Sequence, residues 1–181
     1  MGSHEFYMNY TASRDDVLLL LDSGHFHPTE TISDKISAEL LFKKKMALHV
    51  SRPMRWDSDH VVLFDDEIRA IAREIVNNGP ENFFIGMDFF DASINRITAW
   101  VVGMRSMLKS LLYAELQPVV DMKTLQDNRN FTELMVRDEI MKTMPFGAVW
   151  DHYCELHGVL SESKWYDMVK QYEKEVLSKR Q

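Results

Sequence analysis

Six side chains that can bind a cation or carry a proton occur near three short apolar runs. Carboxylates that are held close together repel one another, so such a group needs a compensating positive charge. A mixture of carboxylate and imidazole ligands suits a divalent metal such as Mn²⁺, Co²⁺ or Zn²⁺, and not a thiolate-bound metal. The six residues are Asp22, His25, His49, Asp57, Asp59 and Asp88. Their types indicate a metal site if the fold brings them together.

Each of these residues also has an ordinary structural interpretation. An aspartate at the end of a strand, such as Asp88, often caps the following helix. A single histidine in an apolar strand, such as His49, is usually a hydrogen-bonded core residue. The pair Asp57 and Asp59 is a weak signal by itself, because loops often contain two nearby aspartates. Only their combination at one place favours a metal site, so the surrounding elements decide the question.

Three apolar runs have the character of strands that are buried on both faces of a parallel sheet. They are Val17–Leu21, Met46–Val50 and Phe83–Met87. Helical periodicity separates them over Thr31–Lys44 and Asp65–Asn77, and the second helix ends at a Gly-Pro stop signal. This alternation predicts an α/β fold in which the carboxyl ends of the strands share one edge of the sheet. Sites are built at that edge, so the six side chains should converge there.

From about residue 97 the pattern changes to helices alone. A long amphipathic stretch, Ile97–Leu116, is followed by expected helices at Asp121–Asn128, Phe131–Thr143, Phe146–His157 and Ser163–Ser178. We therefore divide the chain into residues 1–96, a partial β/α region that holds the candidate ligands, and residues 97–181, its last helix with a helical extension. Three parallel strands cannot close a barrel, which needs about eight. Either further strands come from elsewhere, or the sheet is small and open.

Composition restricts the class of protein further. The 181 residues carry a formal net charge of -7, which argues against a general nucleic-acid binder, because such proteins carry a basic patch. The single cysteine, Cys154, excludes an internal disulfide and fits a reducing, cytoplasmic compartment. No apolar run reaches the roughly 18 residues that a membrane span needs, and the first residues carry no signal peptide. We expect neither nucleic acid nor a membrane as a partner.

Several longer strings around these residues resemble the bacterial L-rhamnose isomerase family. The most specific include Asp-Ser-Gly-His-Phe-His-Pro-Thr-Glu and Arg-Trp-Asp-Ser-Asp-His-Val-Val. The strings that carry the resemblance are residues 5–8, 22–30, 32–38, 49–53, 55–62 and 88–96. The similarity runs from the first residues to the last. It implies the C-terminal three βα units of a TIM (β/α)8 barrel, followed by a helical C-terminal tail, in an enzyme that forms tetramers.

The resemblance also implies a reaction and its cofactors. The family reaction is the reversible conversion of L-rhamnose to L-rhamnulose by a 1,2-hydride shift. Hydride transfer needs a Lewis acid on two adjacent oxygens, and no side chain has to abstract a proton from carbon. The family binds two divalent metals in a complete site, and we expect Mn²⁺, with Zn²⁺ or Co²⁺ as alternatives.

The implied ligand sets divide the six residues between these two metals. One set is His25, Asp57 and Asp59, and the other, which would hold the sugar-binding metal, is Asp22, His49 and Asp88. The residues to which the resemblance gives catalytic roles are His25, Asp57, Asp59 and Asp88. Ligands usually need orienting partners, for which His27, His60 and Asp91 are candidates.

The chain departs from the family in its length. Family members are longer, and Met1 falls where they have an interior residue, so the sequence resembles a truncated or split gene product. A metal-ligating glutamate and an active-site lysine of the family have no counterpart here. Two other functions stay open. One is an inactive chain that serves only as an oligomerising helical module. The other is a metal-dependent TIM-barrel hydrolase, for which Arg52 and Arg55 are the nearby phosphate-binding candidates.

Overall fold

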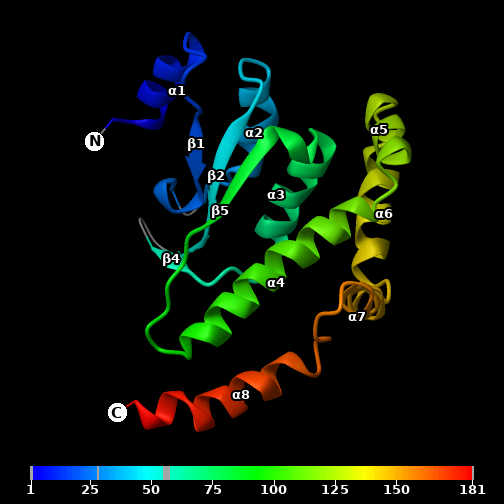
Figure 1. Ribbon diagram of the computed structural model, residues 1–181. Coiled ribbons are helices and arrows are strands. Elements are labelled where there is room, and N and C mark those ends of the chain that lie inside the picture. Colours follow the sequence, from blue (N-terminus) through cyan, green and yellow to red (C-terminus); the bar gives the residue numbers. More distant parts are fainter. Residues whose placement is uncertain (1, 28, 55–57, 181) are drawn as a thin grey trace. The chain divides into compact units, whose positions relative to one another are not determined.

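Three parallel strands form the main sheet of the computed structural model, which describes residues 2–27, 29–54 and 58–180. They are β1 (Leu20–Asp22), β2 (Met46–Val50) and β5 (Phe83–Met87), and they lie side by side in that order (Figure 1). The register places Asp22 opposite His49, and His49 opposite Gly86. The predicted mixed α/β fold with a parallel sheet is therefore confirmed.

Helices connect the strands in the expected order. α2 (Ser33–Leu40) lies between β1 and β2, α3 (Asp66–Asn77) lies between β2 and β5, and α4 (Arg96–Glu115) follows β5. The Asp65 carboxylate caps α3 by accepting a hydrogen bond of 3.1 Å from the Ile68 N–H. These helices bring apolar side chains to the sheet, including Ile36 of α2, Ile71 of α3 and Met107 of α4.

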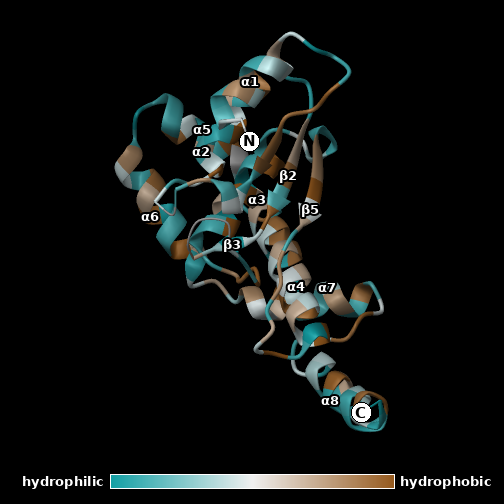
Figure 2. Cartoon of the chain, turned by 90° about the vertical axis from the view of Figure 1, so that its left-hand side faces the viewer, coloured by the Kyte–Doolittle hydropathy of each residue, from teal (hydrophilic) through white to brown (hydrophobic). Residues whose placement is uncertain are grey.

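The hydrophobic core lies on one face of the sheet. In β2 the side chains of Met46, Leu48 and Val50 are buried, whereas the intervening Ala47 and His49 are partly exposed. The buried set extends through β1, β5 and the helices, and comprises Leu19, Leu21, Ile32, Ile36, Met46, Leu48, Val50, Val62, Ile68, Ile71, Ile75, Phe83 and Met107. Figure 2 shows the hydrophobic colouring of β2 and β5. The opposite face of the sheet carries the exposed Leu20 and Phe84.

Several local features differ from the sequence prediction. β1 begins at Leu20 and not at Val17, because β2 begins at Met46, opposite Leu19, and gives the earlier residues no strand to pair with. The helix predicted to reach Lys44 ends at Leu40. Neither α1 (His4–Ala12), which the Ser3 hydroxyl caps, nor the two-stranded antiparallel ribbon was predicted from the sequence. That ribbon pairs β3 (Arg52–Pro53) with β4 (Asp59–His60).

Three short 3-10 helices complete the secondary structure of the described residues. η1 (Ser23–His25) follows β1 directly, η2 (Pro80–Asn82) precedes β5, and η3 (Leu177–Lys179) lies near the end of the described chain. Of these, η1 is important for the site because it begins at the carboxyl end of β1.

The chain forms two compact units, residues 1–114 and 115–181. The second unit contains α5 (Val119–Asp127), α6 (Phe131–Lys142), α7 (Phe146–Leu156) and α8 (Trp165–Glu175), close to the bounds expected from sequence. The domain boundary between residues 96 and 97 stays a prediction. Within the described parts of the chain, the helices are too short or too polar to cross a membrane.

Candidate metal centre

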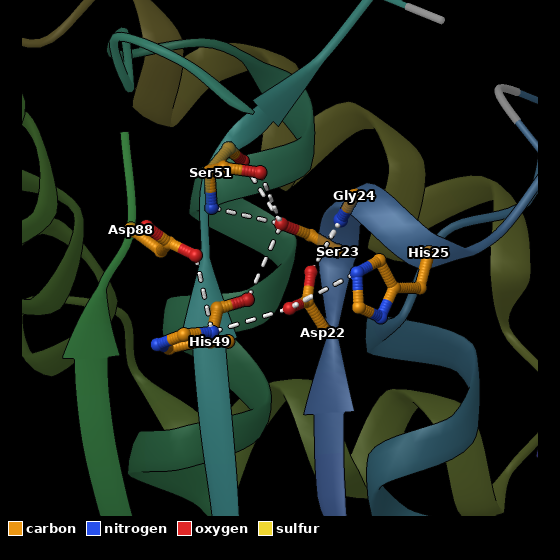
Figure 3. A network of polar contacts seen from close by, with 7 residues as sticks. All are labelled: Asp22, Ser23, Gly24, His25, His49, Ser51 and Asp88. Carbon is orange, nitrogen blue, oxygen red and sulfur yellow. Dashed lines mark hydrogen bonds and ion pairs between the residues drawn. The ribbon is translucent and has the colours of Figure 1, made fainter. Parts of the chain in front are cut away.

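Three of the predicted ligands converge at the carboxyl ends of the three parallel strands. Asp22 ends β1, His49 lies near the end of β2, and Asp88 follows β5 (Figure 3). One ligand atom from each lies within 4.8 Å of the others. Among the described residues, no other group of three or more aspartate, glutamate, histidine or cysteine side chains comes this close together.

Strand alternation explains why these side chains meet. Asp22 lies on the same face of the sheet as Leu20, and His49 on the same face as Ala47, because successive side chains in a strand point to opposite faces. The Asp88 N–H donates to the Val50 carbonyl at 3.0 Å and so extends the pairing of β5 with β2 by one residue. The three candidate ligands therefore occupy the face of the sheet opposite the core.

His49 lies between the two carboxylates. Its Nδ1 is 3.1 Å from Oδ2 of Asp22 and 3.3 Å from Oδ2 of Asp88. Gly86 lies beside the imidazole, and a β-carbon at this position would come within 3.0 Å of Cδ2 of His49. The absence of a side chain at residue 86 thus leaves room for the ring in its present position.

Asp22 is held from two sides. Its side chain is 10% exposed, and Oδ1 accepts a hydrogen bond of 2.8 Å from the Gly24 N–H at the start of η1. Its other oxygen, Oδ2, faces His49. A buried carboxylate is costly unless such groups satisfy it. The turn into η1 therefore stabilises Asp22 and fixes the direction in which Oδ2 points.

The second predicted ligand set is only partly described. His25 lies on η1 with Nε2 3.8 Å from Oδ2 of Asp22, and its side chain is 61% exposed. Asp59 lies on β4 beside the same turn, since a β-carbon added to Gly24 would be 2.6 Å from Oδ1 of Asp59. Asp57 lies outside the described residues. The set His25, Asp57 and Asp59 therefore stays a prediction.

The three residues expected to orient the ligands have other contacts. The Nδ1 of His27 is 2.6 Å from the Thr29 hydroxyl. Asp91 accepts hydrogen bonds from the Ser93 hydroxyl and N–H, at 2.6 and 2.8 Å, and these bonds hold the pKa of its carboxyl below the ordinary value. His60 lies on β4, and its charge also lowers the pKa of Asp91. None of these contacts involves Asp22, His49 or Asp88.

A hydroxyl that the sequence analysis overlooked lies among the ligands. The Ser23 side chain contacts Ser51 and the backbone of His49, and both serines are buried. Serine at the end of a strand ordinarily indicates a turn, so only its position between Asp22 and His25 could have drawn attention to it.

A pocket lined by both polar and apolar side chains adjoins the cluster. Its volume is about 370 Å³, and its lining includes Asp22 and His25. Helix α1 contributes His4 and Tyr7 to the lining, and the segment after η1 contributes Phe26. The pocket is therefore large enough for a small molecule with several hydroxyl groups, at the low end of the range for ligand sites.

The donor set fits a divalent cation. Two carboxylates and one imidazole leave an excess of negative charge, and oxygen and nitrogen donors of this kind suit Mn²⁺, Zn²⁺ or Co²⁺. Atoms that share one such ion lie up to about 4 Å apart. The distances from Nδ1 of His49 to the carboxylate oxygens, 3.1 and 3.3 Å, fall within that limit.

Comparison with known proteins decides the family. The sequence profile of the family described as L-rhamnose isomerase (RhaA) matches residues 1–180. The chain belongs to the L-rhamnose isomerase family. This finding confirms the resemblance inferred from the strings around the candidate ligands.

Individual L-rhamnose isomerases give the same result. The chain is 54% identical over 182 residues to the L-rhamnose isomerase of Pectobacterium carotovorum subsp. carotovorum (strain PC1), and the match covers 100% of this chain and 43% of that protein. It is also 54% identical over 181 residues to the L-rhamnose isomerase of Salmonella typhi, covering 99% of the chain and again 43% of the relative. The chain thus spans less than half the length of the curated relatives it matches.

Proposed function

We propose that this chain supplies metal ligands to an L-rhamnose isomerase, an enzyme that interconverts L-rhamnose and L-rhamnulose by a 1,2-hydride shift. The observation that carries the proposal is the convergence of Asp22, His49 and Asp88 at the carboxyl ends of adjacent parallel strands, in a chain of this family. Mn²⁺ is the ion we propose, with Zn²⁺ or Co²⁺ as alternatives.

The sheet supports a place for these strands within a TIM barrel. Its core face is covered, whereas the face that carries the ligands also carries the exposed Leu20 and Phe84. In a (β/α)8 barrel the helices cover the outside, and the inward side chains pack against those of other strands. We propose that β1, β2 and β5 are the last three strands of such a barrel. The tetramer and the cytoplasmic location stay predictions.

The chain's own residues would hold and orient the reacting groups. When bound, a divalent ion supplies Lewis acidity to two adjacent oxygens of the opened sugar. Asp22 and Asp88 would neutralise its charge, and the Gly24 N–H would keep the Asp22 carboxylate in place. Leu20 and Phe84, on the same face as the ligands, would help exclude water from the reacting carbons.

The second metal site is the less supported part of the proposal. We propose that His25, Asp57 and Asp59 bind it and that a proton of a sugar hydroxyl is transferred there. His25 follows Gly24 in the sequence, and Oδ1 of Asp59 would lie 2.6 Å from a β-carbon added to Gly24, which supports this assignment. In this scheme the catalytic residues are His25, Asp57, Asp59 and Asp88.

A chimera tests the proposed reaction. The chain would be joined to the part of the Pectobacterium carotovorum relative that it does not match, freed of metal, and incubated with L-rhamnose with and without Mn²⁺. We expect L-rhamnulose to form only with Mn²⁺, and a His49→Ala chimera to form none. The full-length Pectobacterium carotovorum enzyme serves as the control. A chimera that folds but stays inactive, under conditions in which that enzyme is active, would contradict the proposal.

The same samples separate the two alternative functions. Hydrolysis of a phosphate ester without ketose formation would favour a metal-dependent hydrolase. A folded chain that binds no Mn²⁺ would favour a helical module without catalysis. Both outcomes differ from the expected one in a directly measured product or in bound metal.

A further inference from the structure

The Ser23 hydroxyl occupies the point at which the pairing of β1 with β2 ends. The last paired residues are Asp22 and His49, and beyond them the chain of β1 turns into η1. Ser23 is 2% exposed at this turn. Figure 3 shows its side chain directed toward Ser51 and the backbone of His49, between the two strand ends.

The hydrogen bonds of this hydroxyl join the two strand ends. The Ser51 N–H donates to Oγ of Ser23 at 2.8 Å. Oγ of Ser23 also lies 3.1 Å from the Ser51 carbonyl and 3.3 Å from the His49 carbonyl, to either of which its single hydrogen can be donated. The Ser51 hydroxyl, at 3.1 Å, can donate to the remaining acceptor position. A hydroxyl has one donor and two acceptor positions, so Ser23 is fully satisfied here.

These bonds continue the sheet in place of the backbone. After Asp22 the chain of β1 leaves the strand conformation, and without another link the end of β2 would be held from this side only by the pairing before it. Ser23 is adjacent to one ligand in sequence and bonds to the backbone of the other. Ser23 therefore adds a buried side-chain link between the two strand ends, beside the backbone register that pairs Asp22 with His49.

We infer that Ser23 is a positioning residue of the metal centre, which sets the distance between Asp22 and His49 through its bonds to the end of β2. The inference rests on the proposed function, because it presupposes that these residues bind a cation. Ser23 itself is not a ligand in this scheme. Its effect reaches the ion only through the two ligands whose backbones it joins.

Ser110 offers a matched control. It is also buried, at 0% exposure, and its hydroxyl donates to a backbone carbonyl, that of Ser106, at 2.9 Å. That bond lies within α4 and joins no ligand. Ser23→Ala and Ser110→Ala thus remove the same buried group, and only the first removal acts on the strand ends.

A substitution at Ser51 should give an intermediate effect. Ser51→Ala removes one hydroxyl contact with Ser23 but keeps the Ser51 N–H and carbonyl, which make the 2.8 and 3.1 Å contacts. The effect of Ser51→Ala should therefore be in the same direction as that of Ser23→Ala, but smaller.

The experiment measures Mn²⁺ binding by the metal-free 181-residue chain and its three variants. The electron paramagnetic resonance signal of free Mn²⁺ gives the dissociation constant, and urea denaturation without metal gives the stability of each protein. We expect Ser23→Ala to weaken Mn²⁺ binding by about 10-fold or more, as for groups that orient ligands. Ser51→Ala should weaken it less, and Ser110→Ala should lower stability without changing the dissociation constant.

Several outcomes would overturn the inference. A folded Ser23→Ala protein with the wild-type dissociation constant would do so, as would an equal loss of affinity in Ser110→Ala. If Ser23→Ala does not fold, the decision passes to Ser51→Ala, for which weaker binding supports the inference and unchanged binding contradicts it. Failure of the wild-type chain itself to bind Mn²⁺ would overturn the proposed function and the role of Ser23 with it.

Discussion

The two faces of the parallel sheet are built from the same three strands but have opposite properties. On the covered face, Leu21 and Leu48 are essentially inaccessible and pack in a core that includes α2 and α3. On the other face, Leu20 is 48% exposed, and the candidate ligands Asp22, His49 and Asp88 lie at the carboxyl ends of the strands. Because successive side chains of a strand point to opposite faces, the same strands place the apolar side chains on one face and the candidate ligands on the other. One face therefore stabilises the fold, while the other is free to carry charged groups.

The largest expected effect tests this division with a pair of matched leucines. Leu48→Ala empties part of the core and should lower the free energy of unfolding by about 2–5 kcal/mol. Leu20→Ala, on the other face of the sheet, should change it by no more than about 0.5 kcal/mol. Urea denaturation of the metal-free chain measures both. Equal losses for the two variants would show that both faces are packed in solution.

The next effect concerns the ligand face alone. Asp22→Asn keeps an oxygen that can accept the Gly24 N–H but removes the negative charge that faces His49. We expect Mn²⁺ affinity to fall by more than about 100-fold, beyond the range for groups that only orient ligands. Metal-free stability should be maintained, because an asparagine caps η1 as well as an aspartate does. Asp16→Asn, a change at an exposed carboxylate, is the control and should leave binding unchanged.

A smaller effect is expected from crowding the imidazole. The β-carbon of Gly86→Ala would lie 3.0 Å from Cδ2 of His49, so the ring must shift. We expect Mn²⁺ binding to weaken by about tenfold or less. Gly147→Ala on α7 provides a control, since its added β-carbon would meet no atom within 4 Å. Unchanged affinity in Gly86→Ala would mean that the ring position is not restricted at this point.

The smallest expected effect is on the pH dependence of stability, and it comes from a carboxylate near the covered face of the sheet. Burial, together with the charge of Asp65, raises the pKa of Glu67 on α3 above its ordinary value of 4.5. Within the described chain, Oε1 of Glu67 is buried without a hydrogen-bond partner. The folded state therefore holds the proton more tightly than the unfolded state does. Stability should fall as the pH rises through 4.5 toward the raised value, and level off above it.

Glu67→Gln removes this titration. The variant should be more stable than the wild type at pH 7, and the difference should shrink as the pH falls through the raised pKa toward 4.5. Urea denaturation at several pH values gives the comparison, with the exposed Glu81→Gln as control. A difference that does not vary with pH would contradict the assignment to Glu67. Together with Asp22→Asn, this variant tests whether a carboxylate is tolerated better on the ligand face than beside the core.

The sequence predicted the parallel sheet well because each strand is a short apolar run between clear helical patterns. The meeting of Asp22, His49 and Asp88 could be predicted for the same reason, since parallel strands end at one edge. The ribbon of β3 and β4 was missed because each strand has two residues, which is too short for a periodic signal. The grouping of His25 with Asp59 could not be settled from sequence, because it depends on the path of the loops between strands.

Helix α1 and the Ser23 hydroxyl were missed for different physical reasons. The aromatic residues of α1, Phe6, Tyr7 and Tyr10, contact one another but are exposed, and the buried residue of this helix is the polar Thr11, so no buried apolar stripe marks the helix in the sequence. Ser23 has the composition of a turn residue, and nothing in its neighbours indicates that its hydroxyl contacts residues 26 and 28 positions later. Long-range side-chain contacts of this kind follow from strand register, which single-sequence patterns do not specify.

The register of β2 against β1 has a consequence for how a correctly folded sample is recognised. A slip of one residue would turn His49 toward the aliphatic interior and bring Leu48 to the cation-binding side, with nearly the same content of strand and helix. Circular dichroism would hardly distinguish the two forms. With the proposed Mn²⁺ site, only the native register would retain the ion, so a titration with Mn²⁺ would also test the quality of refolded preparations.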